Sequence, residues 1–260
     1  MSPRTQRADL LLVERGFAGS RPRAQALIGA GQVYSGDRRV EKAGEKLALD
    51  APLSVRGADI PYVSRGGLKL EAALDHFAVS PEGRVCADLG ASTGGFTDCL
   101  LQRGAARVHA VDVGYGQLAW KIRQDPRVVV HERTNVRTVE SLGERVALVV
   151  GDLSFISLRL ILPAVARIAL PGADCVLLVK PQFEVGREGV SRGGLVRDEA
   201  LREAAVQNVV ESAIEAGFVV VGRMESPVLG AKAGNVEHLI HLTAPAADRA
   251  ILAGVQERLT

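Results

Sequence analysis

From residue 84 onward the chain alternates between short apolar segments with the length of strands and longer segments with the length of helices. Near-continuous apolar strands separated by helices are typical of a parallel sheet that helices cover on both faces. The expected strands lie over 84–90, 107–113, 127–132, 145–152, 174–180, 218–224 and 236–243. The expected helices lie over 94–105, 116–125, 157–170 and 197–217. No helix separates the last two strands, so the sequence predicts an α/β fold with a doubly wound, Rossmann-like sheet that is parallel apart from an antiparallel edge strand.

The N-terminal residues follow a different pattern, with two short helices and then several short strands. Gly16 closes the first helix, and Ser20 is placed to cap the second, which has Pro22 in its first turn. Turn-forming residues between 57 and 61 mark a boundary. The sequence therefore predicts a small domain over 1–57, a linker over 58–64 and the α/β domain over 65–260.

Five arginines and only two carboxylates lie among the first 30 residues, although the whole chain has a net charge of +2. A basic segment on an otherwise balanced chain suits contact with phosphate groups. The segment resembles the αL RNA-binding fold of the ribosomal-protein-S-four type through Arg7-Ala8-Asp9-Leu10, Ser20 to Ala24, Leu27-Ile28, Gly31 and Val33. That resemblance implies RNA-phosphate contacts from Arg4, Arg7, Arg21 and Arg23, with Lys42 as a secondary candidate. The alternative is a helical cap on the larger domain.

A glycine-rich loop, DLGASTGGF, follows the first strand of the α/β domain. Glycines at such a turn let a ligand approach the backbone and the N-terminus of the next helix. The GxxxGG spacing differs from the GxGxxG of dinucleotide binding and resembles the first motif of methyltransferases that use S-adenosylmethionine. Asp88 suits the ammonium group of the methionine moiety, Asp112 suits a ribose diol, and Asn135 or Arg133 could border the adenine. The predicted cofactor-binding residues are Asp88, Gly90, Ala91, Ser92, Gly94, Gly95, Phe96, Asp112 and Asn135. A degenerate nucleotide fold with an empty pocket is the alternative.

Four ionisable residues are expected at the carboxyl edge of the sheet, where such folds bind ligands. Asp152 and Lys180 each end a strand, Glu237 begins the last strand, and Lys69 lies just before the first. Buried charges are costly unless they pair, and two positive and two negative groups can do so. Each residue taken alone could be a solvated surface charge, but together they predict a site.

The chain resembles the TlyA family over nearly its whole length, through segments 62–74, 88–105, 110–125, 132–137, 152–158, 179–186 and 233–239. That family comprises ribosomal RNA cytidine-2′-O-methyltransferases, some of them labelled hemolysins, with an FtsJ-like catalytic domain. The resemblance implies S-adenosylmethionine as cofactor and 16S rRNA, 23S rRNA or both, within ribosomal subunits, as substrate. It also implies the catalytic set Lys69, Asp152, Lys180 and Glu237.

The implied reaction explains why lysines would be needed at this edge. A ribose 2′-hydroxyl is a poor nucleophile until its proton leaves or is strongly hydrogen-bonded. Lys180 is therefore the expected general base, or the group that orients the hydroxyl. Asp152 and Lys69 would position Lys180 and the ribose, and Glu237 would tune the two lysines electrostatically.

Other chemistries and locations fit the sequence less well. The segment DLSF at 152–155 lacks the prolines of amino-group methyltransferases. Cys86, Cys99 and Cys175 form no CxxC pair and are poorly placed as nucleophiles, which argues against a disulfide framework, a metal site and carbon-5 base methylation. No apolar run approaches the ~20 residues that a membrane span needs, and no signal peptide is visible, so a cytoplasmic location is expected. A membrane-active hemolysin and a non-catalytic ribosome-binding factor are the alternatives.

Overall fold

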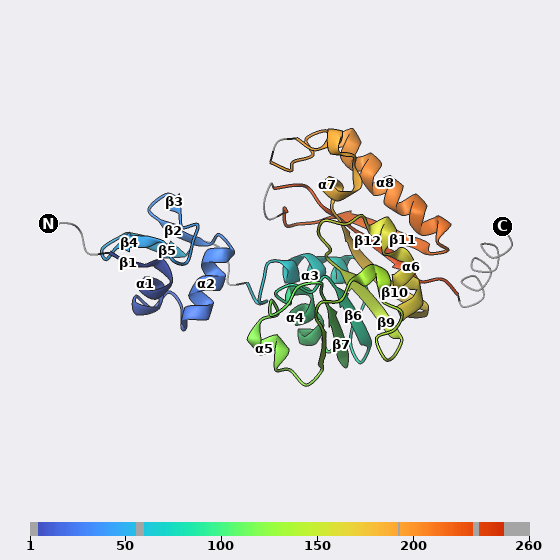
Figure 1. The fold of residues 1–260 in the computed structure, drawn as a ribbon, viewed down its shortest axis with the longest axis horizontal. Helices are drawn as coiled ribbons and strands as arrows, with labels where there is room; N and C mark the ends of the chain where they lie inside the picture. The colour runs from blue at the N-terminus through green and yellow to red at the C-terminus, as the bar shows by residue number, and fades with distance from the viewer. Residues whose placement is uncertain (1–4, 56–59, 192, 231–233, 247–260) are drawn as a thin grey trace. The chain divides into compact units, whose positions relative to one another are not determined.

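The computed structural model describes residues 5–55, 60–191, 193–230 and 234–246. The chain forms two compact units, Met1–Arg65 and Gly66–Thr260. Figure 1 shows the elements of each unit. The linker expected over 58–64 lies partly outside the described residues, so it stays a prediction, as does Arg4, which is also outside them.

The N-terminal unit packs two helices against short strands. Helices α1 (Ala8–Glu14) and α2 (Arg21–Gly29) bury Leu11, Leu12, Leu27 and Ile28 in a core of their own. The side chain of Ser20 accepts a hydrogen bond from the backbone N–H of Arg23, which confirms the expected cap of α2. The strands are β1 (Thr5–Arg7), β2 (Val33–Ser35), β3 (Arg38–Arg39), β4 (Lys46–Ala48) and β5 (Leu53–Val55), with β1 paired to β4 and β2 between β3 and β5. Strands β1 and β5 were not predicted, because three residues are too few to show an alternating pattern.

The C-terminal unit contains a seven-stranded sheet in the order β11-β12-β10-β9-β6-β7-β8. The strands are β6 (Val85–Leu89), β7 (Arg107–Val111), β8 (Val128–His131), β9 (Val146–Gly151), β10 (Ala169–Val179), β11 (Val219–Glu225) and β12 (His238–Thr243). The first five run parallel, whereas β12 is antiparallel to both β10 and β11. The predicted doubly wound sheet with an antiparallel strand near its edge is therefore confirmed.

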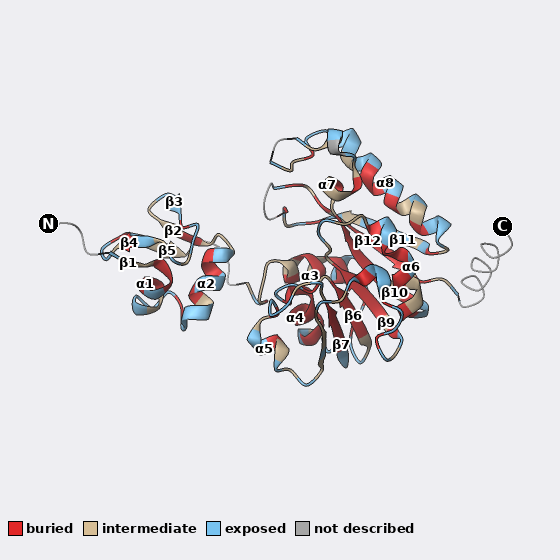
Figure 2. Ribbon diagram, in the orientation of Figure 1, coloured by how far each residue is buried: buried red, intermediate tan, exposed pale blue. Residues whose placement is uncertain are grey.

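Helices cover both faces of this sheet (Figure 1). Helices α6 (Leu162–Ile168) and α8 (Glu199–Glu215) share one hydrophobic core with Ala87 and Leu89 of β6. Side chains alternate along a strand, so Asp88 points to the opposite face, where it bonds to Thr97 of α4 (Gly95–Gln102). Helix α3 (Gly66–His76) packs beside α4. Figure 2 shows the buried residues along the central strands between these layers.

Two of the expected helices differ from the structure. The helix expected over 116–125 is reduced to α5 (Trp120–Arg123), because Gly116 has a positive φ of 68° that a helix cannot continue through. The helix expected over 157–170 is divided into a 3-10 turn, η2 (Leu158–Leu160), and α6, with Pro163 in the first turn of α6. The remaining short elements are η1 (Val136–Thr138), α7 (Pro181–Glu184) and η3 (Arg187–Gly189).

Candidate active site

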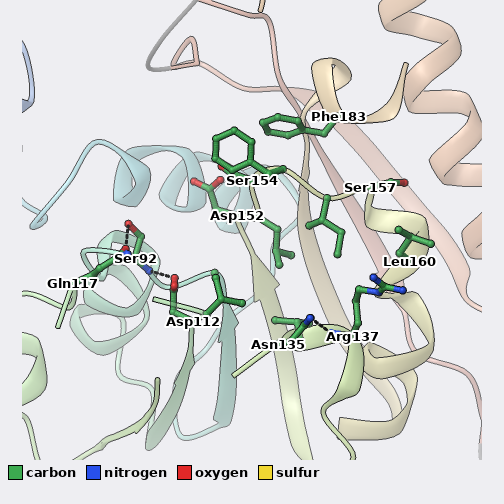
Figure 3. A pocket seen from close by; sticks show the side chains of 16 residues that line it. Ser92, Asp112, Gln117, Asn135, Arg137, Asp152, Ser154, Ser157, Leu160 and Phe183 are labelled. Atoms are coloured by element: carbon green, nitrogen blue, oxygen red, sulfur yellow. Dashed lines mark hydrogen bonds between the residues drawn. The ribbon is translucent and has the colours of Figure 1, made fainter. Parts of the chain in front are cut away.

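A cavity of about 700 Å³ opens at the carboxyl ends of the parallel strands. Figure 3 shows its wall, which comes from the segments that follow β6, β7, β8, β9 and β10. Among the predicted residues, Gly90, Ser92, Asp112, Asn135 and Asp152 line it. Several segments far apart in the sequence thus meet around one space, as expected for a ligand site in an open α/β sheet.

The glycine-rich loop requires glycine at two of its positions. Gly90 has a φ of 84°, and a Cβ there would lie 2.8 Å from the backbone oxygen of Asp152. Gly94 has a φ of 93°, and a Cβ there would lie 2.8 Å from a methyl carbon of Leu118. The loop is therefore held close against the segment after β9, with its backbone open to the cavity at Gly90 and Ser92. Gly94, Gly95 and Phe96 are buried behind it, and Ala91 borders a much smaller neighbouring pocket.

Asp88 lies at the end of β6, fully buried and behind the cavity wall. Its Oδ2 accepts a hydrogen bond of 2.6 Å from the hydroxyl of Thr97, and its Oδ1 has no hydrogen-bond partner among the residues that the structure describes. Burial raises the pKa of this carboxyl to about 7, since desolvation penalises the charged form and the nearby carboxylates of Asp152 and Asp112 oppose a second charge. A cationic donor such as an ammonium group would satisfy the unpartnered oxygen and stabilise the carboxylate.

Asp112 and Asn135 stand on the part of the cavity wall formed after β7 and β8. Asp112 accepts hydrogen bonds from the backbone N–H groups of Ser92, at 2.8 Å, and Gly114, at 2.7 Å. Asn135 accepts one from the backbone N–H of Arg137 at 3.1 Å. Figure 3 shows both side chains at the cavity. Their carboxylate and amide groups are suited to the hydroxyls and base edge of a nucleoside.

The four candidate catalytic residues form two short ion pairs. The Nζ of Lys180 lies 2.5 Å from Oδ1 of Asp152 and donates a hydrogen bond of 2.9 Å to the hydroxyl of Ser154. The Nζ of Lys69, on α3, lies 2.5 Å from Oε2 of Glu237. The side chains of Lys69 and Glu237 are 9% and 3% exposed, so this second pair is almost removed from water.

Strand register brings the two pairs to the same edge. Val179 of β10 is paired with His238 of β12, so the next residues outward, Lys180 and Glu237, are neighbours across the antiparallel ladder. Asp152 follows β9, on the other side of β10. The order across the edge is therefore glutamate, lysine, aspartate, with Lys69 held to the glutamate. The sequence prediction that these four charges pair is supported by this geometry.

Several residues at the site were not identified from the sequence. Ser154 contacts Lys180, Thr97 contacts Asp88, and Phe155 and Phe183 stand at the cavity with their ring centroids 5.2 Å apart. Positions 154 and 155 could have been inferred, because they follow a strand end directly. The Thr97 contact depends on how a helix packs on the sheet, which no local pattern reveals.

The arginines of the N-terminal unit are organised around a buried carboxylate. Arg7 donates two hydrogen bonds of 3.0 Å to Asp9, and Arg21 donates one of 2.9 Å. Gln25 and the backbone N–H of Leu10 also donate to Asp9, each at 3.0 Å. The Arg7 and Arg21 side chains remain 37% and 51% exposed, which leaves part of each guanidinium available to a phosphate group. Lys42 is exposed, and Arg23 is half-buried.

Two other features bear on the alternative functions. Cys86, Cys99 and Cys175 are all buried, and they form no disulfide with one another. Within the part of the chain that the structure describes, no helix has both the length and the apolar character needed to cross a bilayer.

Known proteins resemble the chain along nearly its full length. The FtsJ-like methyltransferase family matches residues 62–244, and the S4 domain matches residues 6–51. The 16S/23S rRNA (cytidine-2′-O)-methyltransferase TlyA of Mycobacterium tuberculosis is 51% identical, over 96% of this chain and 94% of the relative. Hemolysin A of Brachyspira hyodysenteriae is 42% identical, over 90% of this chain and 98% of the relative. A solved Streptococcus thermophilus structure that carries a hemolysin label is 40% identical, covers all of both chains and has a TM-score of 0.74.

These matches agree with the observed architecture, because the S4 match falls in the first compact unit and the methyltransferase match spans the seven-stranded sheet. The family match covers well over half of the 260 residues, and the relatives exceed 40% identity across almost the entire length. The chain therefore belongs to the TlyA family of FtsJ-like methyltransferases, with an S4 domain preceding its methyltransferase domain.

Proposed function

We propose that this protein transfers a methyl group from S-adenosylmethionine to the 2′-hydroxyl of a cytidine in ribosomal RNA, in the 16S molecule, the 23S molecule or both. Its substrate is the RNA within ribosomal subunits, so it works in the cytoplasm. The observation that carries the proposal is the pairing of Lys180 with Asp152 and of Lys69 with Glu237 at one sheet edge, beside the cavity. Amino-group and carbon-5 methylation have no need of two paired lysines.

The residues around the cavity fit the cofactor. Asp88, through its unpartnered oxygen, would receive the ammonium group, Asp112 the ribose hydroxyls and Asn135 the adenine edge. The backbone at Gly90, Ala91 and Ser92 would lie along the ligand, with Gly94, Gly95 and Phe96 supporting the loop from behind. When bound, S-adenosylmethionine supplies an electrophilic methyl group.

The lysines act on the nucleophile. Lys180 removes the proton of the ribose 2′-hydroxyl, or orients that hydroxyl by a hydrogen bond, so that an oxygen lone pair points at the methyl carbon. Asp152 and Ser154 fix the position of the Lys180 Nζ, at 2.5 Å and 2.9 Å, and this nitrogen must be a neutral amine when it accepts the proton. Lys69 and Glu237 hold their own pair beside it and set the local electrostatic field. Most of the acceleration comes from alignment of the hydroxyl with the methyl group.

The S4 domain supplies the grip on structured RNA. Its candidate phosphate contacts are Arg4, Arg7, Arg21, Arg23 and Lys42. Because Asp9 holds Arg7 and Arg21 in fixed orientations, they present their guanidinium groups with little entropy left to lose on binding. The hemolysin label of some relatives has no supporting feature among the described residues of this chain.

The test is transfer of a radiolabelled methyl group to purified ribosomal subunits, followed by mapping of 2′-O-methylated positions. Lys180→Ala should lower kcat by ~10²–10⁴-fold while cofactor and RNA affinities hold. Lys180→Arg should not restore it, since arginine stays protonated. Lys121→Ala is the matched control, because Lys121 also pairs with an aspartate, Asp98, at 2.9 Å, but Asp98, unlike Asp152, does not line the cavity. Full activity in Lys180→Ala would place the chemistry elsewhere.

A further inference from the structure

Two segments that follow neighbouring strands are linked to each other at both ends. The first, 152–158, follows β9 and supplies much of the cavity wall, and the second, 180–184, follows β10. At one end Lys180 contacts Asp152 and Ser154. At the other end the carboxylate of Glu184 accepts two hydrogen bonds, 2.6 Å from the hydroxyl of Ser157 and 2.7 Å from the backbone N–H of Leu158.

Glu184 is almost fully enclosed, with 1% of its side chain exposed. Burial raises the pKa of this carboxyl, while the bonds from Ser157 and Leu158 and the charge of Arg159 favour the ionised form. A buried carboxyl group persists in a fold when its hydrogen bonds are needed there. Both carboxylate oxygens of Glu184 accept hydrogen bonds from Ser157 and Leu158, so Glu184 acts through these residues rather than on the ribose.

The segment that Glu184 holds contains a strained residue. Phe155 has a φ of 65°, in the left-handed region that phenylalanine rarely adopts, and its side chain is 82% exposed. Its ring contacts that of Phe183, the residue before Glu184, at 5.2 Å between centroids. A strained backbone of this kind persists only where the surroundings fix both sides of it. Here Lys180 fixes the chain before Phe155, and Glu184 fixes the chain after it.

We propose that Glu184 is a positioning residue for methyl transfer: by tying Ser157 and Leu158 to α7, it holds the 152–158 segment in the conformation that keeps Asp152 against Lys180. The proposal rests on the catalytic roles proposed above for those two residues. It assigns to Glu184 an effect on kcat rather than on cofactor affinity. The glycine loop and Asp112, which would hold the cofactor, follow β6 and β7, and the loop meets the 152–158 segment at Asp152 and Leu153, the end away from the Glu184 hydrogen bonds.

The decisive comparison is between Glu184→Ala and Glu184→Gln. Alanine removes both hydrogen bonds. Glutamine keeps the geometry without the charge, because its carbonyl oxygen can accept from Leu158 and its amide can donate to the Ser157 hydroxyl. We expect kcat for rRNA methylation to fall by ~10–100-fold in Glu184→Ala, as for a displacement of about 1 Å in a catalytic group. Glu184→Gln should keep kcat within about threefold of the wild type, and both should bind S-adenosylhomocysteine in calorimetry with near wild-type affinity.

Asp174→Ala is the control for a loss that comes from general destabilisation. Asp174 lies midway along β10, the strand that leads to Lys180, and its carboxylate also has two partners, Arg84 at 2.6 Å and His241 at 2.8 Å. It should lower the melting temperature without lowering kcat at a temperature where the protein is folded. Unchanged kcat in Glu184→Ala, or an equal loss of kcat in Asp174→Ala, would overturn the positioning role.

A measurement that does not use activity tests the Glu184 hydrogen bonds separately from the proposed chemistry. Amide hydrogen exchange of the peptide covering 152–160 should accelerate in Glu184→Ala and remain slow in Glu184→Gln, because the Leu158 N–H loses its acceptor only in the first variant. Unchanged exchange in Glu184→Ala would refute the claim that Glu184 holds the 152–158 segment in place. If exchange accelerates while Lys180→Ala keeps full activity, the proposed catalytic site fails and the positioning role fails with it.

Discussion

Each unit of the molecule contains a fully buried aspartate, and the two have opposite surroundings. Asp9 in the N-terminal unit accepts five hydrogen bonds, three of them from arginines. Asp88 in the methyltransferase domain accepts a bond from Thr97, and its other oxygen has no hydrogen-bond partner within the described part of the chain. The hydrogen bonds from Arg7, and then those from Gln25 and Arg21 with the charge of Arg21, hold the pKa of Asp9 well below its usual range, whereas burial raises that of Asp88 to about 7.

This difference distinguishes a carboxylate with a structural role from one with an oxygen that a ligand could bind. A buried acceptor without a partner costs folding free energy, so its presence indicates that something else completes it. The oxygens of Asp9 accept hydrogen bonds from donors of the same chain, and Asp9 orients the arginines around it. Asp88 is buried near the cavity with one oxygen that accepts no hydrogen bond from the described residues, which favours a cationic ligand group.

The largest expected effect is on cofactor affinity. Asp88→Asn should weaken binding of S-adenosylmethionine by ~10–100-fold at pH 8, the value of one charge-assisted hydrogen bond. Asp9→Asn should leave that affinity unchanged, because Asp9 belongs to the other unit. Isothermal calorimetry measures both. Equal affinities for the wild type and Asp88→Asn would mean that the unpartnered oxygen has no role in binding.

The second effect is a pH dependence of that affinity. The cationic ligand group favours ionised Asp88, whose pKa in the free protein is about 7. Affinity should therefore rise as pH rises through 7, by up to ~10-fold between pH 6 and 8, as the ionised fraction grows. Asp88→Asn should show a flat profile over the same range. A wild-type profile that falls with pH would contradict the assignment.

The third effect is on stability, with opposite signs for the two aspartates. The raised pKa of Asp88 gives stability that is fully present below its ordinary pKa and is lost as pH rises toward 7. Asp88→Asn should therefore melt above the wild type at pH 8, with the gap closing toward pH 4. The lowered pKa of Asp9 gives stability that is present above its ordinary pKa and is lost in acid. Asp9→Asn should melt below the wild type at pH 7 and approach it below pH 4, in scanning calorimetry.

The smallest effect concerns RNA. Reversing the charge of Arg7 or Arg21 would place a second carboxylate against Asp9, so folding and binding would change together. Lys42 is exposed and avoids this problem. Lys42→Ala should weaken binding to ribosomal subunits only a few-fold and reduce the log–log salt slope by about one, the value of one phosphate contact. An unchanged slope in filter-binding titrations would remove Lys42 from the RNA surface.

The sequence predicted those features that local patterns express. The strands of the sheet were apparent because each is a continuous apolar run between helices, and Asp152 and Lys180 were apparent because each directly ends such a run. The prediction of a helix over the whole of 116–125 failed because Gly116 has a positive φ, although the residues around it have helical composition.

Contacts that depend on packing were beyond the sequence. Arg7 and Arg21 were expected to face RNA, and nothing in the local pattern showed that Asp9 turns inward and takes part of both guanidinium groups. Nothing in the segment VKPQFEVG distinguishes Glu184, because its hydrogen bonds to Ser157 and Leu158 join two segments that are far apart in the sequence. The same holds for Thr97, which reaches Asp88 only through the docking of α4 on the sheet.

Because β12 comes near the end of the sequence, it determines when the active site can be completed during protein synthesis. Translation delivers Lys69, Asp152 and Lys180 well before Glu237, whose place depends on β12 inserting between β10 and β11. A nascent chain that has not yet extruded residue 243 has Lys69 without its partner and β10 without its neighbour. Domains generally form from the N-terminus while synthesis proceeds. The S4 domain can therefore be complete at a stage when the methyltransferase is still unable to react, and the ability to modify RNA arrives only with the last strand.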